Sequence, residues 1–182
     1  MSLGWRVVGK RWAYRARQFF TRCLAREADI DVDAIRGVLP EPAFQLYQGM
    51  PLGDRIHAQN VWRMVQNGGP CSRDLEQAAL LHDVGKSRAN LSLVHRVLIV
   101  LIQGAHAPLL ERLARDDPHS WRYPFYVHLH HAEIGALLCA DAGCSPLTVA
   151  LVRYHETRSA LPDSPAGLRS NLVKLIYGDD RC

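Results

Sequence analysis

Three absences narrow the class of protein to which this sequence belongs. No run approaches the roughly 20 apolar residues that a membrane-spanning helix needs, and the longest candidate, residues 97–102, is far too short. Arginines are scattered through the N-terminal segment, where a secretory signal peptide would have a continuous apolar core. No segment alternates apolar and polar residues between hairpin turn signals, and no internal repeat is evident. The sequence therefore predicts a cytoplasmic all-α protein.

The cysteines form no metal-binding or disulfide framework. There are five of them, an odd number, and none lies in a CxxC pair. Cys139 and Cys144 are five positions apart without a matching second pair, which argues against a zinc knuckle. Such a pattern is typical of reduced thiols in a cytoplasmic protein.

Charge and length indicate one ordinary globular domain. The net charge of +4 is too small to indicate nucleic-acid binding by itself, and 48% hydrophobic residues are enough for a full core. We expect residues 31–182 to form the domain and residues 1–30 to be a basic helical segment packed on it.

The N-terminal segment is rich in cations and lacks acids. Residues 5–26 hold seven Lys or Arg residues and no Asp or Glu, with aromatic and aliphatic residues between them at partly helical spacing. An amphipathic helix that packs its aromatic residues on the domain is one interpretation. The alternatives are a basic helix that binds an acidic membrane surface or nucleic acid, and a cleaved targeting segment.

Apolar spacing and helix-end residues predict nine helices along the rest of the chain. Ser72, the Ser145–Pro146 pair and Pro124 are typical of helix starts, and Asp54 is a candidate N-cap. The second half of the run from 91 to 102 is apolar nearly all round, as in a buried central helix. The predicted ranges are 32–38, 41–48, 55–66, 73–82, 91–102, 107–115, 124–142, 147–155 and 172–177, with a polar loop over 158–168.

The segment from Ala78 to Lys86 carries the clearest chemical signal. Its apolar first half is followed by His82 and Asp83, two polar side chains that are costly to place beside apolar residues unless something pairs with them. A divalent metal ion would pair with both. Gly85 permits a sharp turn or a close backbone approach, and Lys86 adds a cation near any bound group. The alternative is an exposed His-Asp pair at a helix end.

Together with other phrases, this segment resembles the HD-domain superfamily of metal-dependent phosphohydrolases. The matching features are an isolated His57 on a helix, the phrase Leu80-Leu81-His82-Asp83-Val84-Gly85-Lys86, and a terminal helix closing on Asp179. The phrases His131-Ala132-Glu133-Ile134-Gly135-Ala136 and Arg153-Tyr154-His155-Glu156 are similar to the two added histidines of the branch with a dinuclear site. The resemblance spans residues 54–180 and implies the HD-domain helical bundle.

The resemblance also implies a ligand set for one or two divalent ions (Mn, Fe, Mg, Ni or Zn). His57, His82, Asp83 and Asp179 would bind one ion, and Asp83 would bridge to a second ion held by His131 and His155. Asp180 and His130 are the neighbouring alternatives to Asp179 and His131. Glu133 and Glu156 are candidates to orient ligand imidazoles, with solvated surface carboxylates as the alternative that we favour.

The activity implied is hydrolysis of a phosphoester or phosphoanhydride in a nucleotide-like substrate, with Asp83 and Lys86 as catalytic residues. Lys86 would face the phosphate, and Arg122 is a second candidate substrate contact. No Gly-Tyr-Pro follows Glu156, which argues against a cyclic-dinucleotide phosphodiesterase of the HD-GYP type. The alternatives are a di-iron oxygenase with the same ligands and a non-catalytic, nucleotide-sensing protein that binds a partner.

Overall fold

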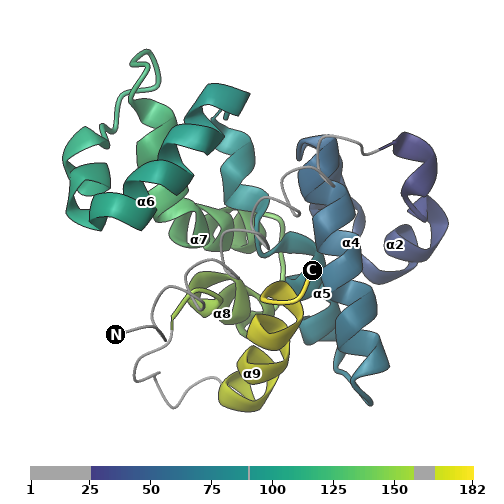
Figure 1. The fold of residues 1–182 in the computed structure, drawn as a ribbon. Coiled ribbons are helices and arrows are strands. Elements are labelled where there is room, and N and C mark those ends of the chain that lie inside the picture. The colour runs from purple at the N-terminus through teal and green to yellow at the C-terminus, as the bar shows by residue number, and fades with distance from the viewer. Residues whose placement is uncertain (1–25, 90, 158–166) are drawn as a thin grey trace.

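A computed structural model describes residues 26–89, 91–157 and 167–182, and every regular element within them is helical (Figure 1). This confirms the all-α prediction. The predicted basic helix over residues 5–26 lies outside the described residues except for Arg26, and so does most of the predicted loop over 158–168. The elements are η1 (Glu27–Asp29), α2 (Val32–Val38), α3 (Glu41–Gln48), α4 (Leu52–Asn67), α5 (Arg73–Leu81), η2 (Val84–Arg88), α6 (Leu93–Leu113), α7 (Tyr123–Asp141), α8 (Pro146–Tyr154) and α9 (Leu168–Asp179).

Side-chain caps start two of the helices as predicted. The Ser72 hydroxyl accepts a hydrogen bond from the Leu75 amide at the start of α5, and the Ser145 hydroxyl accepts one from the Thr148 amide at the start of α8. Each cap satisfies an amide that has no partner within its own helix. Helix α5 therefore begins at the predicted residue, Arg73, and α8 begins one residue before the predicted start at Leu147.

Helix α5 lies at the centre of the molecule. It packs against α3, α4, α8 and α9, and its last four residues, from Ala78 to Leu81, have no exposed surface. A helical turn that is apolar on every side, such as this last turn of α5, is stable only where neighbouring elements cover all of it. The chain leaves this helix directly into His82 and Asp83, so the polar pair begins inside the core and not at the surface.

Helix α6 corrects the prediction of a buried central helix. It lies at one edge of the molecule against α7 (Figure 1), and Val94, Val97, Leu98 and Leu101 remain exposed along its outer face. Its inner face forms a small separate core in which Ile99, Leu110 and Phe125 are buried. The two helices predicted over 91–102 and 107–115 are joined across a kink at His106, where the backbone is not helical (φ −160°, ψ 83°). Among the described helices, none combines the length and hydropathy that a membrane span requires.

The predicted N-cap role of Asp54 is wrong. Helix α4 begins at Leu52 after Pro51, so Asp54 lies within the first turn, and its side chain is 1% exposed. Its carboxylate accepts two hydrogen bonds from the Arg96 guanidinium of α6, at 2.9 and 3.3 Å. This ion pair joins α6 to α4 one turn before His57. The prediction failed because the partner lies 42 positions away in sequence.

The final helix is longer than predicted. Helix α9 begins at Leu168, after Gly167 in a left-handed conformation (φ 82°), and ends at Asp179. Leu168, Leu172 and Leu175 are buried on the side that faces the core. This packing fixes the orientation of α9 and therefore the position of its last residue, Asp179, relative to the core.

Candidate metal centre

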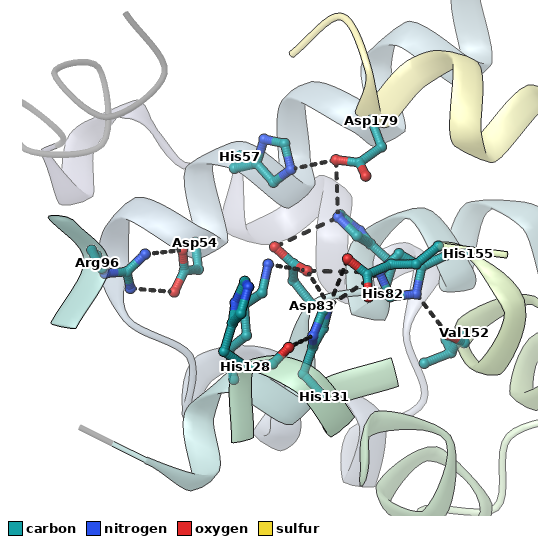
Figure 2. A network of polar contacts seen from close by, with 12 residues as sticks. Asp54, His57, His82, Asp83, Arg96, His128, His131, Val152, His155 and Asp179 are labelled. Carbon is teal, nitrogen blue, oxygen red and sulfur yellow. Dashed lines mark hydrogen bonds and ion pairs between the residues drawn. The ribbon is translucent and has the colours of Figure 1, made fainter. Parts of the chain in front are cut away.

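Five helices contribute polar side chains to one cluster, which Figure 2 shows. His57 lies on α4 and His131 on α7, each on the buried face of its helix. His82 and Asp83 follow α5 directly, His155 follows α8, and Asp179 is the last residue of α9. The structure therefore brings together all six residues that the sequence suggested as metal ligands.

The six residues form two adjacent groups that could each hold a metal ion. In the first group, Asp179 Oδ1 lies 2.9 Å from His57 Nε2 and 3.6 Å from His82 Nε2. In the second group, Asp83 Oδ1 lies 3.4 Å from His131 Nε2 and 3.9 Å from His155 Nε2. The ligand atoms within each group all lie within 4.8 Å of one another.

Asp83 stands between the two groups. Its Oδ2 lies 3.8 Å from His82 Nε2, while its Oδ1 faces His131 and His155. The Lys86 ammonium also lies 2.6 Å from Oδ1. One carboxylate oxygen thus points toward each group, which is the arrangement that a bridging ligand requires.

Three of the four histidines are oriented in the same way. Nδ1 of His82 donates to the Ala79 carbonyl (3.0 Å), Nδ1 of His131 to the His128 carbonyl (2.8 Å), and Nδ1 of His155 to the Val152 carbonyl (2.7 Å). Since a carbonyl oxygen only accepts, the proton of each neutral ring lies on Nδ1. Each Nε2 then presents a lone pair to the centre of the cluster, as a ligand imidazole must.

Within the described part of the chain, no group donates a hydrogen bond to the Nε2 atoms of these three rings in this tautomer. His131 Nε2 and His155 Nε2 are 3.3 Å apart although both are acceptors in this tautomer, and His82 Nε2 is buried without a hydrogen-bond partner among the described residues. A buried acceptor without a donor is unfavourable by about 1–3 kcal/mol. A cation between these atoms would satisfy all three lone pairs, so the donor set fits a metal ion.

The charges of the cluster also suit cation binding. Burial alone would raise the pKa of Asp83, but Lys86, His82 and His131 hold it well below the usual 3.8, so the carboxylate is ionised. Burial likewise opposes ionisation of Asp179, and contact with His57 and His82 outweighs it and lowers the pKa. For His82, burial lowers the pKa, while Asp83 and Asp179 raise it above 6.5 overall.

His155 differs from His82 in the number of carboxylates nearby: among the described residues one, Asp83, lies within 4 Å of His155 Nε2, whereas Asp83 and Asp179 both lie within 4 Å of His82 Nε2. Burial, followed by the neighbouring imidazoles of His82 and His131, lowers the pKa of His155 from 6.5 to about 3. The ring is therefore neutral at physiological pH and keeps its Nε2 lone pair.

We expect the metal-free protein to lose stability as the pH falls from 6.5 toward 3. In this range the unfolded chain protonates His155 and the folded chain does not, so the free energy of unfolding decreases by about 1.4 kcal/mol per pH unit. The raised pKa of His82 changes the free energy of unfolding only above pH 6.5. The lowered pKa values of Asp83 and Asp179 change it only below pH 3.8. Urea unfolding in chelator between pH 6 and 4 measures the slope. The slope of the free energy of unfolding against pH should be smaller in His155→Gln. Equal slopes in the two proteins would contradict the assignment of the lowered pKa to His155.

Two glycines allow the backbone of η2 to touch that of α7. A Cβ on Gly85 would lie 2.0 Å from the carbonyl oxygen of His131 and 2.8 Å from the amide nitrogen of Gly135. A Cβ on Gly135 would lie 3.2 Å from the Gly85 amide nitrogen. The close approach expected at Gly85 is confirmed, and it sets the distance between Asp83 and His131.

Other residues considered from the sequence lie elsewhere. The Arg122 guanidinium donates to the carbonyls of Leu113 and Arg112 at the end of α6, so its predicted substrate contact stays a prediction. His130 is exposed beside Tyr126, and Asp180 is exposed after α9, so neither belongs to the two groups.

Two contributions to the cluster come from residues outside the six predicted ligands. His128 contributes its carbonyl to His131, and its ring accepts a hydrogen bond from Gln103 of α6 (3.0 Å). A histidine three residues before a candidate ligand on the same helix is the signal that could have drawn attention to this carbonyl. The Asp54–Arg96 pair beside His57 left no local signal, because its partners are distant in sequence (Figure 2).

No protein-family model, no curated protein and no solved structure matches the chain.

Proposed function

We propose that the protein is a metal-dependent phosphohydrolase that cleaves a phosphoester or phosphoanhydride of a nucleotide-like substrate. The observation that carries the proposal is the convergence of buried Nε2 atoms without donors on the ionised carboxylates of Asp83 and Asp179. Such a site is costly to fold unless it binds a cation. The resemblance of the phrase around His82 and Asp83 to HD-domain phosphohydrolases supports the same assignment.

Two sets of residues would hold the ions. His57, His82 and Asp179 would bind one ion and His131 and His155 the other, with Asp83 between them. Imidazole-rich sets suit Fe, Ni or Zn, and the carboxylates of Asp83 and Asp179 also admit Mn, whereas Mg prefers a set made of oxygen ligands. Ions bound here would supply Lewis-acid chemistry, lowering the pKa of water and offsetting charge on a phosphoryl group.

The solvent-facing side of the cluster indicates where a substrate would enter. The side chains of His57, His82, Asp83, His131 and His155 are at most 4% exposed, whereas those of Lys86 and Asp179 are 17% and 33% exposed. Lys86 is therefore the cation of the cluster that an incoming phosphate would meet. Its contact with Asp83 orients the ammonium toward the side where a phosphoryl oxygen would bind.

Metal analysis and phosphate release test the proposed function together. Protein purified without chelator should contain a divalent transition ion, and it should release phosphate or a nucleoside monophosphate from part of a panel of mono-, di- and cyclic nucleotides with Mn²⁺. Lys86→Met should lower kcat/KM on the order of 100-fold, because the phosphate contact is lost. Metal content should be measured on the same samples, because the substitution also removes the ammonium that lies 2.6 Å from Asp83 Oδ1.

Lys174→Met is the matched control. The Lys174 ammonium donates to the Pro70 carbonyl, on a different part of the surface, so kcat/KM should remain at the wild-type value. Iron-dependent oxygen consumption without phosphate release would instead favour the oxygenase alternative. Protein that binds no metal and hydrolyses no member of the panel would overturn the proposal.

A further inference from the structure

We propose that Glu156 is an additional, exchangeable ligand of the ion held by Asp83, His131 and His155. This inference rests on the proposed metal centre and extends its ligand set by one residue. Glu156 Oε1 lies 3.9 Å from His131 Nε2, on the side of the imidazole that faces the cluster.

The position of the carboxylate excludes the orienting role considered from the sequence. A carboxylate that orients a ligand histidine accepts the hydrogen bond of the other ring nitrogen. In His131 that nitrogen, Nδ1, already donates to the His128 carbonyl at 2.8 Å. Glu156 approaches the opposite nitrogen, whose lone pair is directed into the cluster, so the two groups face each other as acceptors.

The distance fits shared coordination better than a hydrogen bond. At 3.9 Å the Oε1 and Nε2 atoms are too far apart for a direct bond. Two ligand atoms that each lie about 2.1 Å from one ion are separated by roughly 3–4 Å. The separations of His131 Nε2 from Asp83 Oδ1 (3.4 Å) and from His155 Nε2 (3.3 Å) fall in the same range. His131 Nε2 therefore has Asp83 and His155 as partners within one candidate group, and Glu156 Oε1 lies at a comparable distance from the same nitrogen.

Exposure distinguishes Glu156 from these co-ligands. Its side chain is 56% exposed, whereas those of Asp83 and His155 are at most 3% exposed. The buried ligands are held by packing, but a carboxylate at the surface can leave the ion and return without disturbing the core. Glu156 would thus occupy the coordination position that a catalytic site leaves open to water or substrate.

The chain places Glu156 at this position through its neighbour. His155 follows the last residue of α8, and its Nδ1 donates to the Val152 carbonyl at 2.7 Å. This hydrogen bond orients the His155 ring, and the Thr157 amide donates to the Tyr154 carbonyl at 2.8 Å, which closes the backbone turn that contains Glu156. Glu133 differs, since both of its carboxylate oxygens accept hydrogen bonds from Arg153, at 2.8 and 3.0 Å.

Titration of the metal-free protein with Co²⁺ tests the inference without any substrate. Calorimetry should resolve two ions in the wild type, and the visible absorption of Co²⁺ should report each ligand set. In Glu156→Gln the ion at His57, His82 and Asp179 should bind with wild-type affinity, while the second ion binds at least tenfold more weakly and with a changed spectrum.

Glu133→Gln is the matched control, because it removes the same charge from the α7 and α8 region without removing a proposed ligand. Both of its Co²⁺ affinities should equal those of the wild type. A second ion that binds Glu156→Gln with wild-type affinity and spectrum would overturn the role of Glu156 and leave the proposed function intact. Wild-type protein that binds no Co²⁺ would overturn the metal centre itself and this inference with it.

Discussion

Gly85→Ala should destabilise the protein by about 3 kcal/mol or more, because the new methyl group has no space. Its carbon would lie 2.0 Å from the carbonyl oxygen of His131 and 2.8 Å from the Gly135 amide nitrogen, both backbone atoms of a buried helix. Overpacking commonly costs 1–3 kcal/mol, and more where the neighbouring atoms cannot move aside. Urea unfolding measures the loss of stability. Metal titration should also show weakened binding, because α7 must move away from Asp83 and takes His131 with it.

Gly37→Ala is the control for the substitution itself. Gly37 lies within α2. A Cβ built there has no atom within 4 Å apart from its two chain neighbours and the nearby backbone of its own helix. Alanine at this position should stabilise the protein by about 0.5–1 kcal/mol, since it is the better helix former. If Gly85→Ala were as stable as the wild type, the close contact of η2 with α7 would be wrong.

Asp83→Asn should remove metal binding from both groups and reduce hydrolysis at least 1,000-fold. Asp83 is the proposed ligand between the groups, and its charge would attract a second cation there. An amide also presents N–H donors, which would satisfy the imidazole lone pairs that otherwise bind the ion. Metal content after dialysis, followed by phosphate release with added Mn²⁺, measures both effects.

The control for Asp83→Asn is a carboxylate far from the cluster. Asp141 is exposed at the end of α7, and Asp141→Asn should keep the wild-type metal content and activity. Retention of two ions by Asp83→Asn would show that this carboxylate does not bridge the groups. Loss of activity with both ions retained would restrict Asp83 to a role in the chemical step.

Most helix positions could be read from the sequence because helix ends depend on nearby residues. The caps at Ser72 and Ser145 lie three residues from the amides that they satisfy, so their signal is local. The exposure of α6 could not be predicted in this way. Its apolar residues surround the helix, and only the arrangement of the other helices determines which of its faces is covered.

The candidate ligands were also found in two steps, first from sequence phrases and then from the structure. Sequence phrases identified His57, His82, Asp83, His131, His155 and Asp179, and their role as ligands stays a prediction. Phrases alone did not separate His131 from His130 or Asp179 from Asp180. The structure separates them, because His131 and Asp179 reach the cluster while His130 and Asp180 are exposed.

The sequence by itself determined an all-helical protein, most of its helix limits and the chemical types of the polar residues, since these depend on neighbours within a few positions. The tertiary structure alone decided that His57 and Asp179, 122 positions apart, lie in contact. It also decided that Asp83 stands between two groups and that Glu156 faces a ligand atom of His131. Such distances depend on how whole helices pack, and no local pattern of residues specifies them.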